Sequence, residues 1–80
     1  MMNKQTINIY IYAPDKSMIG KMEEHYVPFN KGEHISVSGV SYEVLSINHL
    51  LNLDYRGLFV HREVIVIAKP LQNYVQGNSL

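Results

Sequence analysis

Histidines offer this chain its most versatile chemistry, because an imidazole can bind a metal ion or carry a proton near neutral pH. The chain has four histidines and no cysteine, which excludes disulfides, thiolate zinc sites and a cysteine nucleophile. The four are His25, His34, His49 and His61. No two have the short His-x-x-x-His spacing that gathers metal ligands on one element. We therefore predict no metal site and no cofactor, although strand pairing would place His34 beside Glu43.

Other catalytic combinations are also missing from the sequence. A hydrolase triad needs a serine beside a histidine, and Ser36, Ser41 and Ser46 lie in segments that read as strands without a Gly-x-Ser-x-Gly motif. Glu23 and Glu24 are adjacent, so a strand would point them to opposite faces. The five glycines stand apart and form no phosphate-binding loop. We expect that the protein is not an enzyme.

Length and composition favour one small domain. The chain has 80 residues, 46% of them hydrophobic, and its seven basic and seven acidic side chains cancel. This balance argues against the basic surface of a dedicated nucleic-acid-binding protein. No apolar run is long enough to span a membrane, and no apolar signal core opens the chain, so we expect a cytoplasmic protein. The expected domain covers residues 1–69, and residues 70–80 are expected to form a flexible tail.

The pattern of apolar residues predicts an all-β fold with five strands. The expected strands cover residues 5–12, 17–26, 33–37, 40–50 and 58–69. The first gives the clearest signal, because Ile7, Ile9 and Ile11 alternate with polar or tyrosine residues. Bending antiparallel strands in so short a chain tend to close on themselves, which predicts a five-stranded antiparallel small barrel. An α+β fold with a helix at about 15–26 is the alternative, since Met18, Ile19 and Met22 also lie on one side of a helix.

Two turn sequences predict how neighbouring strands pair. A loop at residues 13–16 would give the partners Ile11–Met18, Ile9–Gly20 and Ile7–Met22. A Ser-Gly turn at residues 38–39 would give the partners Val37–Val40, Ile35–Tyr42 and His34–Glu43. In the segment 40–50 the apolar pattern changes phase after Val44, which predicts a bulge or a sharp bend.

The segment 29–35, followed by Gly39, Tyr42 and Val44, resembles the opening strands of SH3-like barrels, especially the short barrels encoded by bacteriophages and mobile elements. The resemblance covers residues 29–68 and supplies no catalytic residue. It implies a small barrel and an accessory role, in which the protein binds and modulates a host protein in the host cytoplasm. The acidic and aromatic cluster by which peptide-binding SH3 domains hold proline-rich ligands is missing.

Tyrosines supply the candidate binding surface. If the isoleucines of segment 5–12 point inward, Tyr10 and Tyr12 point outward, and we expect Ile19 and Lys21 beside them. Exposed tyrosines suit contact with a partner protein, because they offer a large area at low entropic cost. A cross-strand aromatic cluster that only stiffens the hairpin is the structural alternative.

Two further partners remain open at this stage. Single-stranded nucleic acid could stack on the same tyrosines, with Lys4, Tyr55 and Arg56 as additional contacts. A second copy of the chain is the other candidate partner. Residues 64–67 are apolar on both faces of the last strand, and a second copy could shield the face that does not meet the interior.

Overall fold

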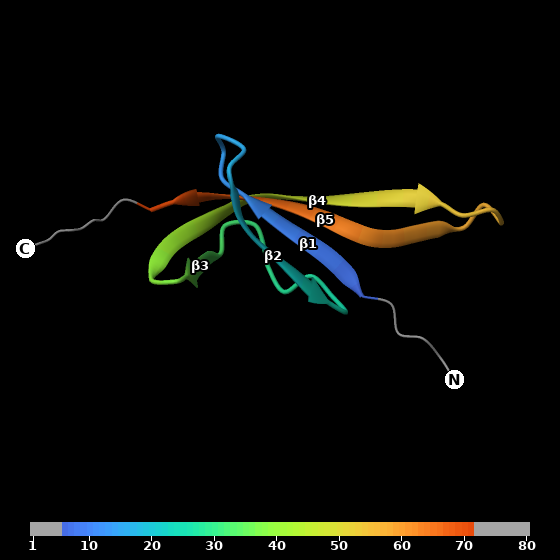
Figure 1. Cartoon of the computed structure of the whole chain (residues 1–80), viewed down its shortest axis with the longest axis horizontal. Coiled ribbons are helices and arrows are strands. Elements are labelled where there is room, and N and C mark those ends of the chain that lie inside the picture. Colours follow the sequence, from blue (N-terminus) through green and yellow to red (C-terminus); the bar gives the residue numbers. More distant parts are fainter. Residues whose placement is uncertain (1–5, 72–80) are drawn as a thin grey trace, which may run out of the picture.

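The computed structural model describes residues 6–71, and all of their regular elements are β-strands. They are β1 (Ile7–Tyr12), β2 (Met18–Glu24), β3 (His34–Val37), β4 (Val40–Leu53) and β5 (Phe59–Pro70). These strands form one five-stranded sheet in the order β2-β1-β5-β4-β3 (Figure 1). The predicted all-β fold is confirmed. The helix alternative for residues 15–26 is wrong, because β2 occupies this segment, and no helix that could cross a membrane occurs between residues 6 and 71.

The sheet is mixed, because β1 and β5 run parallel while the other neighbouring strands run antiparallel. This corrects the expectation of a purely antiparallel barrel. Four successive reversals of the chain bring β5 back to the direction of β1, so the two strands can only meet in parallel. The meander thus closes between β1 and β5, and within the described residues β2 and β3 do not pair. The result is a sheet curled into a half-barrel (Figure 1).

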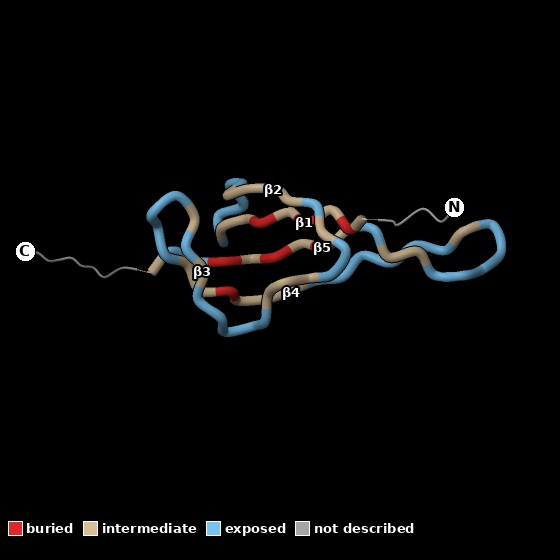
Figure 2. Tube along the Cα trace, turned by 90° about the horizontal axis from the view of Figure 1, so that it is seen from below, coloured by how far each residue is buried: buried red, intermediate tan, exposed pale blue. Residues whose placement is uncertain are grey.

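The core lies on the concave face of this sheet. Its buried members are Ile7, Ile9, Ile11, Val44, Val64, Val66 and Ala68. They come from β1, β4 and β5, which Figure 2 shows as the red segments in the middle of the sheet. The inward orientation predicted for the three isoleucines is confirmed, since Ile9 is fully buried and Ile7 and Ile11 are nearly so.

The register of the first hairpin differs from the prediction by two residues. Ile9 pairs with Met22 and Ile11 pairs with Gly20. The loop is one residue shorter than expected, because the N–H of Ala13 donates to the carbonyl of Ser17 at 2.8 Å. A bulge then shifts the pairing by one more residue. A shift of two leaves each isoleucine on its predicted face, because side chains alternate with period two.

The second hairpin has the predicted pairing. Ile35 lies opposite Tyr42, and His34 lies opposite Glu43. The two turn residues both have positive φ, 51° at Ser38 and 84° at Gly39. These angles are those of a type I′ turn, whose twist matches that of the strands it joins.

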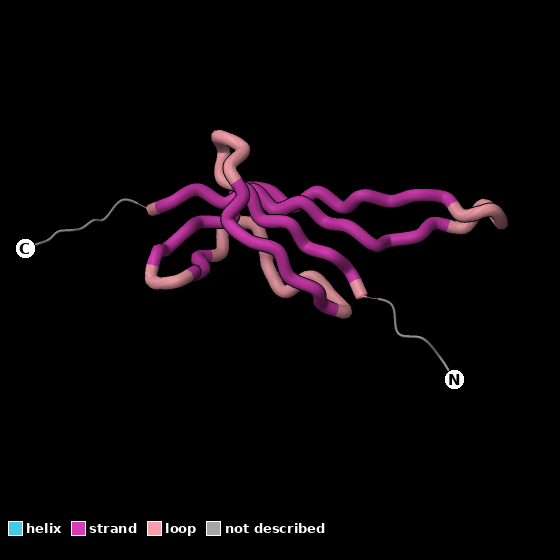
Figure 3. Tube along the Cα trace, viewed as in Figure 1, coloured by secondary structure: helices cyan, strands magenta, loops and turns pink. Residues whose placement is uncertain are grey.

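Strands β4 and β5 form the longest pairing in the sheet and bend it twice. The pairing shifts between Val44 and Ser46, where the change of apolar phase predicted a bulge, and again between Leu50 and Leu51. Strand β4 runs three residues beyond its predicted end at residue 50. Pairing between β1 and β5 starts at Glu63, so beyond this point the β4–β5 hairpin continues alone. We call this projecting part, residues 50–62, the arm; it extends to the right in Figure 3.

Candidate functional site

Tyr10 and Tyr12 lie on the convex face of the sheet, opposite the core, as the alternation in β1 predicted. Strand register places Tyr10 beside Ile65 and Tyr12 beside Ile67. On the β2 side, Tyr10 lies beside Lys21 and Tyr12 lies beside Met18. We call this surface the tyrosine face, and it consists of Tyr10, Tyr12, Met18, Lys21, Ile65 and Ile67.

An open apolar hollow of about 290 Å³ lies on the tyrosine face. Tyr12, Ile65 and Ile67 line it together with Lys16. The ammonium of Lys21 lies 5.5 Å from the centre of the Tyr10 ring, which is the distance of a cation–π contact. The hollow is near the lower end of the ~300–1,000 Å³ range of small-molecule pockets. Because it is also open to solvent, it suits a side chain projecting from another protein.

Charges of opposite sign bound the tyrosine face at its two ends. Lys16 lies at the end formed by the first hairpin loop, while Lys21 lies beside Tyr10 along the β2 side of the face. At the other end, Asn8 has Glu23 on one side and Glu63 on the other. A partner that covers the apolar middle would therefore meet a basic edge and an acidic edge, which would fix its orientation.

Ile19 does not lie on the tyrosine face, and this part of the prediction is wrong. The bulge leaves Ile19 unpaired between Met18 and Gly20, and its side chain packs against the core. It also lines a second apolar hollow, of about 250 Å³, between β2 and β3. Met18, which is 52% exposed, lies beside Tyr12 instead, on the surface where Ile19 was expected.

The sequence prediction also missed Ile65 and Ile67, although a signal for them exists. The run of residues 64–67 is apolar at every position, so one of its two faces had to lie away from the core. The structure gives the inner positions to Val64 and Val66, both fully buried. The outer positions therefore fall beside the two tyrosines.

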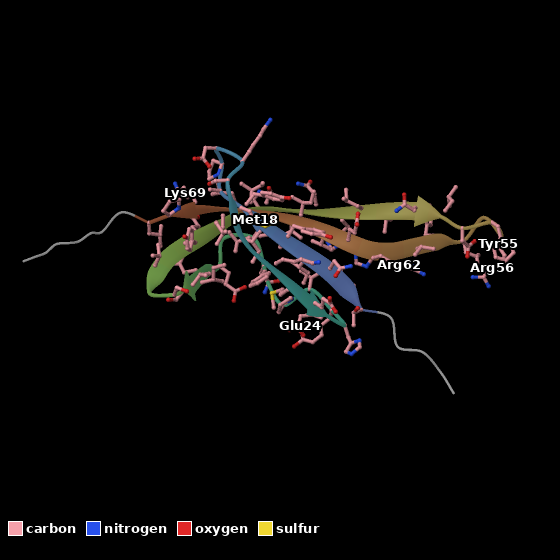
Figure 4. All side chains as sticks on the ribbon, viewed as in Figure 1. Met18, Glu24, Tyr55, Arg56, Arg62 and Lys69 are labelled. Atoms are coloured by element: carbon pink, nitrogen blue, oxygen red, sulfur yellow. The ribbon has the colours of Figure 1, made fainter. Side chains whose placement is uncertain are left out.

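The residues expected to contact nucleic acid do not join the tyrosines. Tyr55 is 95% exposed in the loop at the tip of the arm, and Figure 4 shows Tyr55 and Arg56 far from Met18. Asn48 is level with Tyr10 across β5, and Leu53 at the tip lies five positions further along β4, a distance of ~17 Å. Lys4 lies outside the described residues.

Asp54 holds the loop that carries Tyr55. Its carboxylate accepts two hydrogen bonds from the Arg56 guanidinium, at 2.7 and 3.1 Å, and two from the backbone N–H groups of Arg56 and Leu58. The hydrogen bond from the Arg56 side chain is the main reason that the pKa of Asp54 lies below its ordinary value. Arg56 also lies 5.7 Å from the Tyr55 ring, so its charge is shared between a carboxylate and an aromatic ring.

Two of the four histidines meet on the concave side of the sheet. Nδ1 of His49 and Nε2 of His61 are 3.0 Å apart, so one ring donates an N–H and the other accepts it. Between residues 6 and 71, no three histidine, cysteine, aspartate or glutamate side chains gather where they could hold a metal ion. The pair therefore has the geometry of a cross-strand hydrogen bond at the base of the arm.

Comparisons with known proteins do not assign the chain to a group. No protein-family model matches it, and neither does any curated protein or solved structure. The resemblance of residues 29–68 to phage-encoded SH3-like barrels stays a prediction. The surfaces of the half-barrel itself are therefore the guide to what the chain binds.

Proposed function

We propose that the protein is a non-enzymatic interaction module that binds a partner protein through the tyrosine face. One observation carries this proposal: the parallel pairing of β1 and β5 sets Tyr10 beside Ile65 and Tyr12 beside Ile67 on the side away from the core. Two aromatic rings and two branched aliphatic side chains thus share one surface. Tyrosine-rich apolar patches of this kind are typical of the centres of protein interfaces.

The edges of the face support the same proposal. Lys16 at one end, Lys21 along the β2 side and glutamates at the other end give a polar border around an apolar middle, which is the usual anatomy of a protein interface. Tyr12, Ile65 and Ile67 leave room for one large side chain of the partner in the 290 Å³ hollow. We infer that a single apolar or aromatic residue of the partner is the anchor of the contact.

The biological setting of this module follows only from the resemblance of residues 29–68 to phage-encoded barrels. We propose an accessory protein that binds a host protein in the host cytoplasm and modulates its activity. Such a role needs one good surface and no catalytic group, and the tyrosine face would supply that surface.

A capture experiment tests the proposed function. The tagged protein is incubated with an extract of the cells that produce it, and captured proteins are identified by mass spectrometry. We expect a specific protein with the wild type and its loss with the double variant Tyr10→Ser/Tyr12→Ser. Tyr26→Ser is the matched control, because Tyr26 is 65% exposed and lies outside the strands. Equal recovery of that protein by the double variant would contradict the proposal.

Single-stranded nucleic acid is the second candidate partner, and the exposed Tyr55 with Arg56 beside its ring favours it. A base could stack on this ring while Arg56 contacts a phosphate. Salt separates the two candidates, because nucleic-acid binding weakens steeply through counterion release. A contact centred on tyrosines and isoleucines changes little over the same range of salt.

A further inference from the structure

Strand β4 has a long free edge. On one side it pairs with β5 along most of its length, and on the other it pairs with β3 only from Val40 to Glu43. The backbone of Val44 makes the next contacts on that side, with Gly32 and Glu33. From residue 45 to Leu53, no strand in the described part of the chain covers this edge.

The free edge lacks the features that usually prevent strands from pairing with other molecules. Residues 46–53 contain no charged residue, no proline and no glycine. The other two edges of the half-barrel are protected: β3 has four residues, and β2 carries Lys21, Glu23, Glu24 and a bulge. Short edges, charges and bulges are the common means of blocking edge pairing. The uncovered edge of β5 from Phe59 to Arg62 is also short and ends in a charge, and the bulge of β4 lies at residue 45, at one end of its free edge. Residues 46–53 of β4 are therefore the longest unprotected edge in the described part of the chain.

The concave face of the arm is apolar and exposed as well. Leu51, Leu53 and Phe59 are 51%, 63% and 73% exposed, and register places them on the same side as Val64. The concave apolar face that forms the core therefore continues along the arm without cover, where Figure 2 shows the chain as exposed. An isolated two-stranded hairpin is only marginally stable in water, so such an arm gains stability when it is covered.

We propose that two copies of this chain form a twofold symmetric dimer through antiparallel pairing of residues 45–53 of β4. The pairing would join both sheets into one and bring the apolar face of each arm against the other copy. Such a contact limits the assembly to two copies, because the backbone N–H and C=O groups of each β4 edge bind those of the other and no free β4 edge remains.

The charges of the arm fit a second copy as its occupant. Asp54 is paired with Arg56, so Arg62 is the single unbalanced charge of the arm and lies at its base, next to Glu63 in the chain. The segment that would pair, residues 45–53, carries no charge, so the two copies do not repel each other along it. An antiparallel pair of identical segments also places the same uncharged pattern on both strands, with no like charges opposite each other.

The area of the arm also fits a dimer. Six large apolar side chains are exposed there: Leu50, Leu51, Leu53, Tyr55, Leu58 and Phe59. At roughly 100 Å² each, they expose on the order of 600 Å² per copy, of which Leu51, Leu53 and Phe59 lie on the concave side, and the backbone strip of residues 45–53 adds to the area available for pairing. A stable interface buries about 800 Å² per partner.

The dimer leaves the tyrosine face free, because that face lies on β1, β2 and β5 and the pairing uses the outer edge of β4. One dimer would therefore present two tyrosine faces. If the partner protein has repeated subunits, this bivalence would raise the apparent affinity without any new contact.

Molar mass in solution tests the proposal. Light scattering coupled to size-exclusion chromatography, from low to high micromolar concentration, should give twice the mass of one chain. The double variant Leu51→Lys/Leu53→Lys should give a folded monomer, because both side chains are exposed in the single chain, whereas the antiparallel pairing would set the two lysines against Ile47 and Leu45 of the other copy. Val40→Lys, at a position that is 45% exposed on the paired part of β4, should stay dimeric.

Three results would overturn the proposal. They are a monomeric wild type at every concentration, a dimer that survives Leu51→Lys/Leu53→Lys, and a monomeric full-length chain that dimerises once residues 72–80 are removed. The last would identify those residues as the cover of the edge; they follow Leu71, whose N–H donates to the carbonyl of Ser41 near the other end of β4. Amide hydrogen exchange adds a second readout, since amides of residues 45–53 should exchange more slowly at higher concentration only in the dimeric variants.

Discussion

Tyr12 of β1 and Ile67 of β5 lie side by side in a parallel pair, on the face of the sheet opposite the core. This relationship arises because two strands at opposite ends of the chain become neighbours when the meander closes. It turns two separate signals, a tyrosine pattern near the start and an apolar run near the end, into one surface. The proposed function depends on this surface.

Ile67 should therefore contribute to partner binding. We expect Ile67→Thr to weaken binding of the captured protein about tenfold, because it removes apolar area at the hollow while keeping a β-branched side chain. Thermal unfolding should show that the variant stays folded. Val40→Thr is the matched control, since Val40 lies outside the tyrosine face, and an equal loss of affinity in both variants would speak against the face.

Ile9 is the most sensitive position of the core. It is fully buried in a domain whose total stability is only about 4–12 kcal/mol, by scaling from chain length. Ile9→Ala should cost ~2–5 kcal/mol, whereas Ile9→Val should cost ~0.5–1.5 kcal/mol. Ile9→Asp should unfold the protein, because a buried unpaired charge exceeds what this core can tolerate. Denaturant unfolding followed by circular dichroism measures all three, and a folded Ile9→Asp variant would contradict the inward orientation.

The turn between β3 and β4 offers a stabilising substitution. Ser38 has a φ of 51°, in the left-handed region that asparagine adopts more readily than serine. Ser38→Asn creates the Asn-Gly sequence preferred in type I′ turns, and we expect a gain of about 0.5 kcal/mol, or a few degrees in Tm. Ser41→Asn, at an exposed position within β4, should give no gain.

The loop at the tip of the arm should loosen in acid. Hydrogen bonds from Arg56 lower the pKa of Asp54 in the folded state, so protons bind more weakly to the folded chain than to the unfolded one. The carboxylate therefore stabilises the loop above the ordinary aspartate pKa, and this contribution is lost as the pH falls through the lowered value. NMR titration should show the amide shifts of Arg56 and Leu58 moving together with the Asp54 carboxyl. In Asp54→Asn this coupled change should disappear.

The sequence predicted those features of the fold that depend on local pattern. The alternation of Ile7, Ile9 and Ile11 was sufficient to orient β1, and the Ser-Gly turn was sufficient to set the register of β3 against β4. The register of the first hairpin depended instead on Lys16 at a φ of 76° and on the bulge that leaves Ile19 unpaired. Lysine gives no sign of a left-handed conformation, which usually falls to glycine or asparagine.

The remaining differences concern contacts between distant parts of the chain. The parallel pairing of β1 with β5 joins residues more than fifty positions apart, which no local pattern encodes. Strand β4 runs on to Leu53 as a largely uncovered strand, although exposed leucines are unusual in a stable one-domain protein. The candidate site was predicted in part, since Tyr10, Tyr12 and Lys21 lie together, while Ile65 and Ile67 joined them only through the closed sheet.

Site-specific photo-crosslinking at position 12 tests the proposed function most directly. A photoreactive phenylalanine analogue replaces Tyr12 in one variant and Tyr26 in another, and each protein is irradiated in the cells that produce it. We predict a covalent adduct with one partner protein from position 12 and none from position 26, because only position 12 lies in the tyrosine face. No adduct at position 12, or the same adduct from both positions, would contradict the proposed binding surface.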